Sequence, residues 1–129
     1  FYGCNSLSKI ELQSATIIGS NAFTGCVALT DVYLPSVEII HNNAFSNCNS
    51  LSKVELPSLT LIGTSAFYSC SNLKSIYLTG SSVASCSSRA LYMAAATIGI
   101  EAIYVPASLI ESYKALDCWS AYVDLFVGI

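Results

Sequence analysis

Charged residues are scarce in this chain of 129 residues. Only 10% of them are Asp, Glu, Lys or Arg, against roughly 25% in an ordinary soluble protein. Five basic and eight acidic residues leave a formal net charge of -3. Nucleic acids and anionic membrane surfaces attract proteins through dense Lys and Arg. The composition therefore disfavours nucleic acids and anionic membranes as partners, and we expect no nucleic-acid ligand.

Long apolar runs are also missing. The longest, Ala90 to Ile100, is interrupted by Thr97 and Gly99 and is well short of the roughly 20 residues that span a bilayer. The sequence predicts no transmembrane segment. Phe1 is not an initiator methionine, and neither a basic region nor a cleavage site follows it. We therefore expect the chain to be the C-terminal fragment of a longer protein.

What the chain does have is an internal repeat, which has to be found before any motif is interpreted. Each unit has a Leu three residues after its cysteine, an Ile or Val six residues after it, and a Leu eight residues after it. Ala-Phe pairs precede the last three of these cysteines, and Phe1 takes the same Phe position. The cysteines recur every 22 residues, at Cys4, Cys26, Cys48 and Cys70.

The Ile-x-Leu part of each unit alternates with a period of two, which predicts a short strand with its apolar residues on one side. One such strand cannot bury that side alone. If each unit turns once and stacks on the next, the strands pair as a parallel sheet about 4.8 Å apart, and the apolar columns form one core. Pro35 and Pro57 should end their strands. Gly19 and Gly63 should serve the turn that follows, because glycine tolerates unusual backbone angles.

This pattern resembles the BspA-like leucine-rich repeats of bacterial cell-surface proteins, whose units read roughly L-x-x-I-x-L-P and then I-G-x-x-A-F-x-x-C. Residues 51–70 follow it without a gap, and the resemblance covers residues 1–79. It implies a repeat solenoid: a right-handed stack of 22-residue coils with a short parallel β-sheet on the concave face. Residues 80–99 depart from the pattern, with Cys86 out of register, before a strand returns near Ile100.

The last part of the chain looks like the terminal segment that closes many members of this family. A solenoid needs such a cap because its last coil would otherwise leave the core open. A helix-like apolar spacing that could lie across that end is formed by Leu109, Ile110, Tyr113, Leu116 and Trp119. We expect a single domain, with the solenoid over residues 1–106, including an irregular unit at 80–99, and the C-terminal cap over 107–129.

The cysteines are expected to be structural. The four in the repeat would stack about 5 Å apart with parallel side chains, whereas a disulfide needs Cβ atoms about 3.8 Å apart and turned toward each other. They should therefore be free, buried thiols that behave as small apolar side chains. No paired cysteines or neighbouring histidine suggest a metal site. Cys86 and Cys118 could meet in the closing region, and whether they are bridged stays open.

No constellation suggests catalysis. His41, the single histidine, stands where other units have Gly19 and Gly63, so it should lie in an exposed turn away from any strand nucleophile. Glu11 and Glu55 occupy one column two strands apart, about 10 Å along the stack, with no apolar pocket to raise a pKa. The glycines form no phosphate-binding loop. We expect neither an enzyme nor a cofactor.

The outward positions of the predicted strands are the candidate binding residues. Alternating charges on adjacent strands are expected to offset one another. The tyrosines suit a binding interface, although tyrosine is also simply a good strand former. The side of the coils that lies away from these strands, rich in Ser and Asn, should expose no aromatic column. The candidate residues are Lys9, Glu11, Asp31, Tyr33, Lys53, Glu55, Tyr77 and Tyr104.

These features favour a non-enzymatic module that recognises a protein or glycan through one open sheet face. The family resemblance adds an exported or cell-surface, adhesin-like setting. The alternative is a structural spacer that displays another domain and has no ligand of its own. The identity of the ligand and the oligomeric state are left open by the sequence.

Overall fold

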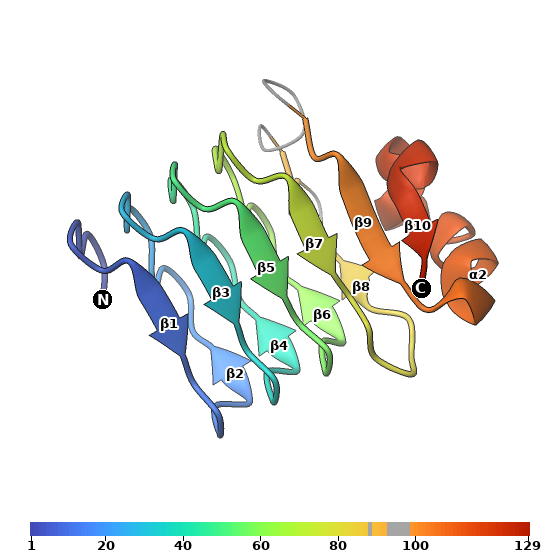
Figure 1. The fold of residues 1–129 in the computed structure, drawn as a ribbon, viewed down its shortest axis with the longest axis horizontal. Coiled ribbons are helices and arrows are strands. Elements are labelled where there is room, and N and C mark those ends of the chain that lie inside the picture. Colours follow the sequence, from blue (N-terminus) through green and yellow to red (C-terminus); the bar gives the residue numbers. More distant parts are fainter. Residues whose placement is uncertain (88, 93–98) are drawn as a thin grey trace.

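The structure, a computed structural model, describes residues 1–87, 89–92 and 99–129. Successive coils stack along one axis, and each of the first four adds one strand to each of two parallel sheets (Figure 1). The larger sheet has the order β1 (Lys9–Glu11), β3 (Asp31–Tyr33), β5 (Lys53–Glu55), β7 (Ser75–Tyr77), β9 (Ala102–Val105) and β10 (Phe126–Gly128). The smaller sheet has the order β2 (Ile17–Ile18), β4 (Ile39–Ile40), β6 (Leu61–Ile62) and β8 (Ser85–Cys86).

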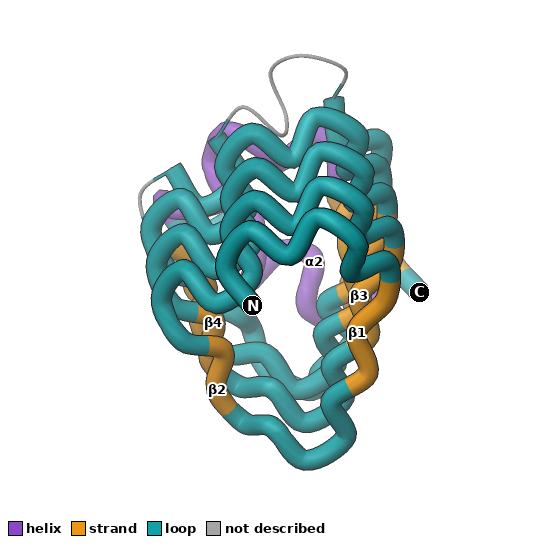
Figure 2. Tube along the Cα trace, turned by 90° about the vertical axis from the view of Figure 1, so that its left-hand side faces the viewer, coloured by secondary structure: helices purple, strands orange, loops and turns teal. Residues whose placement is uncertain are grey.

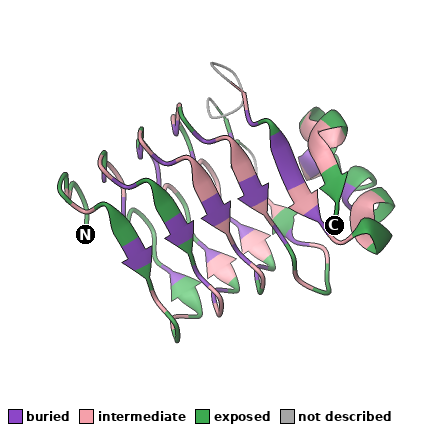
Figure 3. Ribbon diagram, in the orientation of Figure 1, coloured by how far each residue is buried: buried purple, intermediate pink, exposed green. Residues whose placement is uncertain are grey.

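The larger sheet has the register that the repeat predicts. Ile10 pairs with Val32, Val32 with Val54, and Val54 with Ile76. The next partner of Ile76 is Ile103, on the strand that follows the irregular stretch. In each of the first four strands the middle residue is buried and its neighbours are more exposed (Figure 3). Period-two alternation thus separates a core face from an outer face.

The second sheet is not predicted by the sequence, which placed a turn after Ile18. Viewed along the stack, the two sheets lie on different sides of the coils (Figure 2). Ile18, Ile40 and Ile62 are buried, and the aliphatic residue before each points outward. Two adjacent aliphatic residues per coil suit a two-residue strand, since β-branched side chains fit a pleated surface.

The glycines expected to supply unusual backbone angles do not do so. Positive φ occurs instead at Gly99 and in two columns of turn residues. One column is Gly3, Gly25, Asn47 and Ser69, and the other is Asn21, Asn43, Ser65 and Arg89. Asparagine enters this left-handed region more readily than most residues. Gly63 has a different role, because a Cβ atom there would lie 2.7 Å from the backbone carbon of His41 in the adjacent coil. The expectation is therefore wrong for the angles, and close packing explains Gly63.

Two ladders of equivalent side chains run through the core. The rings of Phe1, Phe23, Phe45 and Phe67 stack with centroids 5.2–5.4 Å apart and planes within 8° of parallel. Beside them, each repeat cysteine from the second onward donates its thiol hydrogen to a Phe carbonyl of the previous coil, over 3.0–3.2 Å. The cysteines therefore act as weak donors as well as apolar filler.

The irregular stretch contains most of a further coil. Cys86 pairs with Ile62 in the smaller sheet, so it is in register with the core isoleucines and not with the other cysteines. The carbonyl of Ala90 accepts the amide hydrogen of Phe67, as the carbonyl of Ala66 does for Phe45. Ala90 and the buried Leu91 thus continue the Ala-Phe columns at a longer spacing. Residues 88 and 93–98 of this predicted unit lie outside the described residues.

The C-terminal segment closes the stack with short pieces and not with one helix. It comprises η1 (Ala107–Leu109), α2 (Ile110–Lys114), η2 (Asp117–Leu125) and the strand β10, which pairs in parallel with β9. Tyr113 and Trp119 are buried as expected, and Leu109 and Ile110 pack partly buried against the core. Leu116 is 37% exposed. The prediction for Leu116 is wrong because its backbone is extended, which ends the helical spacing.

Side chains of this segment also satisfy the free edge of the smaller sheet. The amide of Ala84 donates to Tyr113 Oη over 3.0 Å, and Trp119 Nε1 donates to the carbonyl of Ala84 over 2.8 Å. The amide of Cys86 donates to Cys118 Sγ over 3.2 Å. Buried backbone groups without a hydrogen-bond partner cost free energy. These three side chains supply the hydrogen bonds that the backbone of another coil would otherwise provide.

We expect Phe45→Ala to lower the free energy of unfolding by about 3–5 kcal/mol, because a fully buried ring in a central coil loses both transfer energy and packing. The matched change Phe1→Ala should cost much less, since that ring is 72% exposed. Urea denaturation of both variants measures the difference. Equal losses would contradict the stacked order of the Phe rings.

Candidate binding surface

The structure places all eight candidate residues on the outer face of the larger sheet. One column consists of Lys9, Asp31 and Lys53, and the other of Glu11, Tyr33, Glu55, Tyr77 and Tyr104, with adjacent members paired across the strands. Those on β1 and β3 are exposed, and those on β5, β7 and β9 are half-buried. The face thus becomes less accessible toward the C-terminal end of the stack.

The charges on this face pair within strands and not between them. Lys9 Nζ lies 2.5 Å from Glu11 Oε1, and Lys53 Nζ lies 2.6 Å from Glu55 Oε1. These hydrogen bonds raise the pKa of each lysine. Each lysine reaches a carboxylate two residues along its own strand, and the charge of Asp31 on the strand between them adds to the rise in pKa of both lysines. The predicted offset between Lys9, Asp31 and Lys53 is therefore present as a charge interaction without an ion pair. Among the described residues Asp31 has no ion-pair partner within 4.0 Å.

Tyr33 lies at an open hollow on the charged half of the face. The hollow has a volume of about 630 Å³ and is lined by Lys9, Glu11, Asp31, Tyr33 and Glu55. The tyrosine is 43% exposed, and its neighbours across the sheet are Glu11 and Glu55. Carboxylates therefore lie on both sides of the Tyr33 ring, at Glu11 and Glu55, and a third, that of Asp31, lies on its own strand. The ring offers an apolar surface surrounded by hydrogen-bond acceptors.

The other half of the face is aromatic. Tyr77 and Tyr104 stack with ring centroids 4.4 Å apart and planes 12° from parallel. Lys53 Nζ lies 5.0 Å from the centre of the Tyr77 ring, within the range of a cation–π contact. Val127 of β10, the neighbour of Tyr104, is 41% exposed and continues this column. Glu55 separates the pair from Tyr33, so the tyrosines form one group of two and one single ring.

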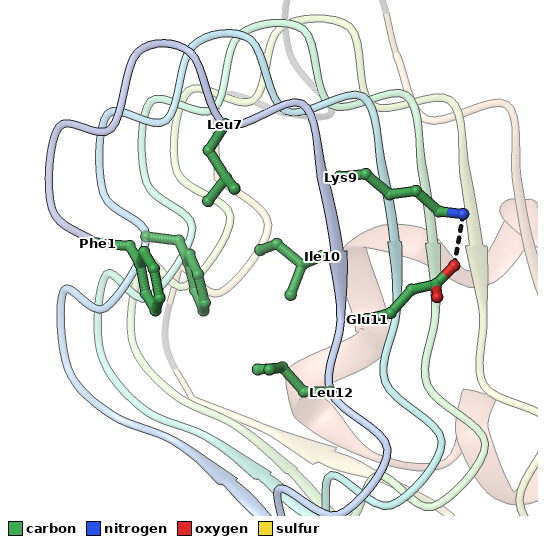
Figure 4. A pocket seen from close by; sticks show the side chains of 7 residues that line it. Phe1, Leu7, Lys9, Ile10, Glu11 and Leu12 are labelled. Carbon is green, nitrogen blue, oxygen red and sulfur yellow. Dashed lines mark ion pairs between the residues drawn. The ribbon is translucent and has the colours of Figure 1, made fainter.

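A second hollow, of about 200 Å³, lies at the N-terminal end of the stack and not on the outer face. Figure 4 shows Phe1, Leu7, Ile10 and Leu12 pointing into it, while the Lys9–Glu11 pair lies on the opposite side of the strand. The walls of this hollow are the apolar columns of the first coil. It is the uncovered end of the core.

Two outward features were missed by the sequence reasoning. Tyr68 and Tyr92 are exposed and stack with centroids 6.0 Å apart, and the Arg89 guanidinium lies 5.6 Å from the Tyr92 ring. The expectation that no aromatic column is exposed away from the larger sheet is therefore wrong. Phe67-Tyr68 and Leu91-Tyr92 carried the signal, but the longer spacing between them hid it.

The second missed feature is an aliphatic column on the outer face of the smaller sheet. Ile17, Ile39 and Leu61 pair in register there. Ile17 is 53% exposed, and the other two are half-buried. The repeated pairs of adjacent aliphatic residues could have revealed this column from the sequence, had a second strand been considered.

The residues considered for chemistry lie apart. His41 is exposed in the turn after β4, and Glu11 and Glu55 lie on strands on either side of β3. All six cysteines are free. Within the described ranges, no group of His, Cys, Asp and Glu is arranged to hold a metal ion. No helix in the described part of the chain is long and apolar enough to span a membrane.

The repeat cysteines differ in burial. Cys26, Cys48 and Cys70 are inaccessible to solvent, while Cys4, in the first coil, is half-buried and less protected than expected. Burial raises the pKa of the Cys26 thiol. The neighbouring Cys48 thiol, together with burial, raises the pKa of Cys70, whereas Cys70 lowers the pKa of Cys48. Since the thiolate is the reactive form, Cys26 and Cys70 are poor nucleophiles. Cys48 is protected by its burial alone.

Comparison with known proteins agrees with this architecture. Residues 1–117 match the family described as the BspA type leucine rich repeat region, in six copies. Among curated proteins, none matches the chain.

We expect Cys26, Cys48 and Cys70 to resist a thiol reagent in the folded chain and to react once denaturant is added, because all three are buried. Cys4 should react faster than these three without denaturant. Timed alkylation followed by peptide mapping measures each rate. Rapid native labelling of the three buried thiols, or a mass that shows bridges among them, would contradict the packed ladder.

Proposed function

Because the chain belongs to the BspA-type leucine-rich-repeat family, we propose that it is a non-enzymatic binding module that recognises a protein or glycan through the outer face of its larger sheet. The observation that carries this proposal is the open hollow around Tyr33. It combines an exposed ring with carboxylates and a lysine on a face that packs against no other described element.

Tyrosine suits such a role because it provides a large rigid contact area with a polar tip. Asp31 adds to this, because it has no ion-pair partner among the described residues and so keeps acceptor capacity for a ligand. The stacked Tyr77 and Tyr104 provide a second contact on the same face. Aromatic rings of this kind suit protein side chains and the apolar faces of sugar rings alike.

The setting we propose is the exterior of a bacterial cell. BspA-type repeats are typically found on bacterial cell surfaces, and an exported, adhesin-like protein would display the sheet face toward its partner. We further propose a right-handed coil direction with a 22-residue unit as the basic period, with residues 1–106 as the solenoid and 107–129 as the cap of one domain.

A structural spacer is the second candidate, and one observation favours it. Lys9 and Lys53 are already paired with glutamates of their own strands, so most of the charge on the face is satisfied without a ligand. In a spacer the face would be a solvated surface, and the stack would only set the distance to another domain.

Two double variants distinguish these functions. Tyr33→Ala with Tyr77→Ala should abolish most binding to an array of oligosaccharides and purified extracellular proteins. The melting temperature should stay within a few degrees, because Tyr33 is exposed and Tyr77 is half-buried outside the core. The matched control Tyr68→Ala with Tyr92→Ala removes two tyrosines from another side of the coils and should leave binding unchanged.

If binding survives in the Tyr33/Tyr77 variant but is lost in the control or after His41→Ala, the outer face of the larger sheet is not the binding surface. A native chain that binds no member of the array would favour the spacer.

A further inference from the structure

Cys86 and Cys118 face each other across the boundary between the last coil and the cap. The amide of Cys86 donates to Cys118 Sγ over 3.2 Å, and Cys86 Sγ donates to the carbonyl of Cys118 over 3.0 Å. Each residue therefore contributes one backbone atom and its Sγ to these two contacts. Both side chains are half-buried and not sealed in the core.

This arrangement differs from that of the repeat cysteines. Those stack as equivalent residues of successive coils, and each thiol from Cys26 onward bonds to a Phe carbonyl. Parallel side chains do not turn their Cβ atoms toward each other, as a disulfide requires. Cys86 and Cys118 belong to different elements, β8 and η2, which are in contact.

The surrounding contacts hold the two elements in place. Ala84, two residues before Cys86, exchanges hydrogen bonds with Tyr113 and Trp119, and all three of these residues are buried. Trp119 directly follows Cys118 in the chain. The segment that carries Cys118 is therefore fixed against β8 before any covalent bond exists, with Cys118 Sγ 3.2 Å from the Cys86 amide nitrogen.

We propose that Cys86 and Cys118 form a disulfide by exchange with a small-molecule disulfide such as oxidised glutathione, and that this bond fastens the cap to the last coil. The inference is independent of the binding face, because it rests on the opposite sheet and the end of the stack.

The exchange balances in two steps. The Cys118 thiolate attacks one sulfur of oxidised glutathione, and one glutathione leaves as a thiolate. The Cys86 thiolate then attacks Cys118 Sγ in this mixed disulfide, forms the Cys86–Cys118 bond and releases the second glutathione. Both protein thiols lose their protons, and the oxidant gains two electrons as it becomes two thiols.

The order of attack follows from burial. Burial raises the pKa of Cys86, and the neighbouring Cys118 thiol raises it further, so the thiolate fraction of Cys86 is small. In the second step the sulfur that Cys86 attacks, Cys118 Sγ, is already beside it, and proximity compensates for the small thiolate fraction. Exchange should therefore accelerate as the pH rises.

Such a bond would close a loop that runs from the last coil into the cap and would restrict the unfolded chain. Disulfides persist in exported and cell-surface proteins, where the surroundings are oxidising. Cys26, Cys48 and Cys70, buried and bonded to carbonyls, would be spared in the same surroundings, whereas the half-buried Cys4 is open to a mixed disulfide.

Trypsin separates the outcomes, because cleavage after Lys74, Arg89 and Lys114 leaves Cys86 in peptide 75–89 and Cys118 in peptide 115–129, each as its only cysteine. The reduced, folded chain is incubated with oxidised glutathione without denaturant. We expect these two peptides as a linked pair, with a mass two hydrogen atoms below the sum of the free peptides. The melting temperature should rise by several degrees and return to its former value with a reductant.

Cys86→Ser and Cys118→Ser are the matched controls. Each should give at most a mixed disulfide with glutathione at the remaining thiol of the pair, and neither should show the rise in melting temperature. The proposal is overturned if the folded native chain keeps both thiols, stops at mixed disulfides, or links other peptides under conditions that oxidise a free model dithiol.

Discussion

The hydrogen bonding of each coil to the next is the constraint on which the rest of the structure depends. A coil of this size contains only short strands, and their backbone groups find partners mainly in the adjacent coils. Phe45, for example, donates its amide hydrogen to Ala66 while its carbonyl accepts the thiol hydrogen of Cys70. Equivalent residues must therefore lie directly above one another, and the ladders of Phe rings and thiols follow from this register. Stability then comes from a sum of interfaces between neighbours.

The same constraint explains the form of the cap. A stack in which each coil forms its hydrogen bonds with the adjacent coils ends with two open sheet edges. Such edges can pair with other chains. β10 covers the edge of the larger sheet with a strand, and Tyr113, Cys118 and Trp119 cover the edge of the smaller sheet with side chains. The outward residues of the larger sheet join these interfaces mainly through their backbones, as the Tyr77 carbonyl does for the Leu56 amide. Their side chains lie outside the core, which is why the larger sheet can carry a charged half and an aromatic half.

The sequence predicted well what the register decides. The 22-residue recurrence, with one longer step to Ile103, placed five strands of the larger sheet, the buried column from Ile10 to Ile103 and the outward column that contains Tyr33 and Tyr77. It did not predict β10. Sequence-based prediction failed where local backbone geometry, or the longer coil after β7, sets the position of a residue. A two-residue strand such as Ile39–Ile40 is too short for alternation to reveal. The position of Cys86 depends on a longer coil, and the extended backbone at Leu116 breaks a spacing that otherwise suits a helix.

The candidate site shows the same division. Register alone brings its eight residues onto one face, but side-chain reach decides that Lys53 pairs with Glu55 and lies over Tyr77 while Asp31 is left without an ion pair. These contacts depend on rotamers, which spacing in the sequence does not encode.

Amide hydrogen exchange of the native chain, followed residue by residue, tests the stacked register most directly. The account predicts slow exchange for Phe45, whose amide bonds to Ala66, and for Leu56, whose amide bonds to the carbonyl of Tyr77, because both bonds join central coils on different sides of the stack. Slow exchange at Leu56 with fast exchange at Phe45 would mean that the coils pair only along the larger sheet, and it would contradict the closed, hydrogen-bonded stack.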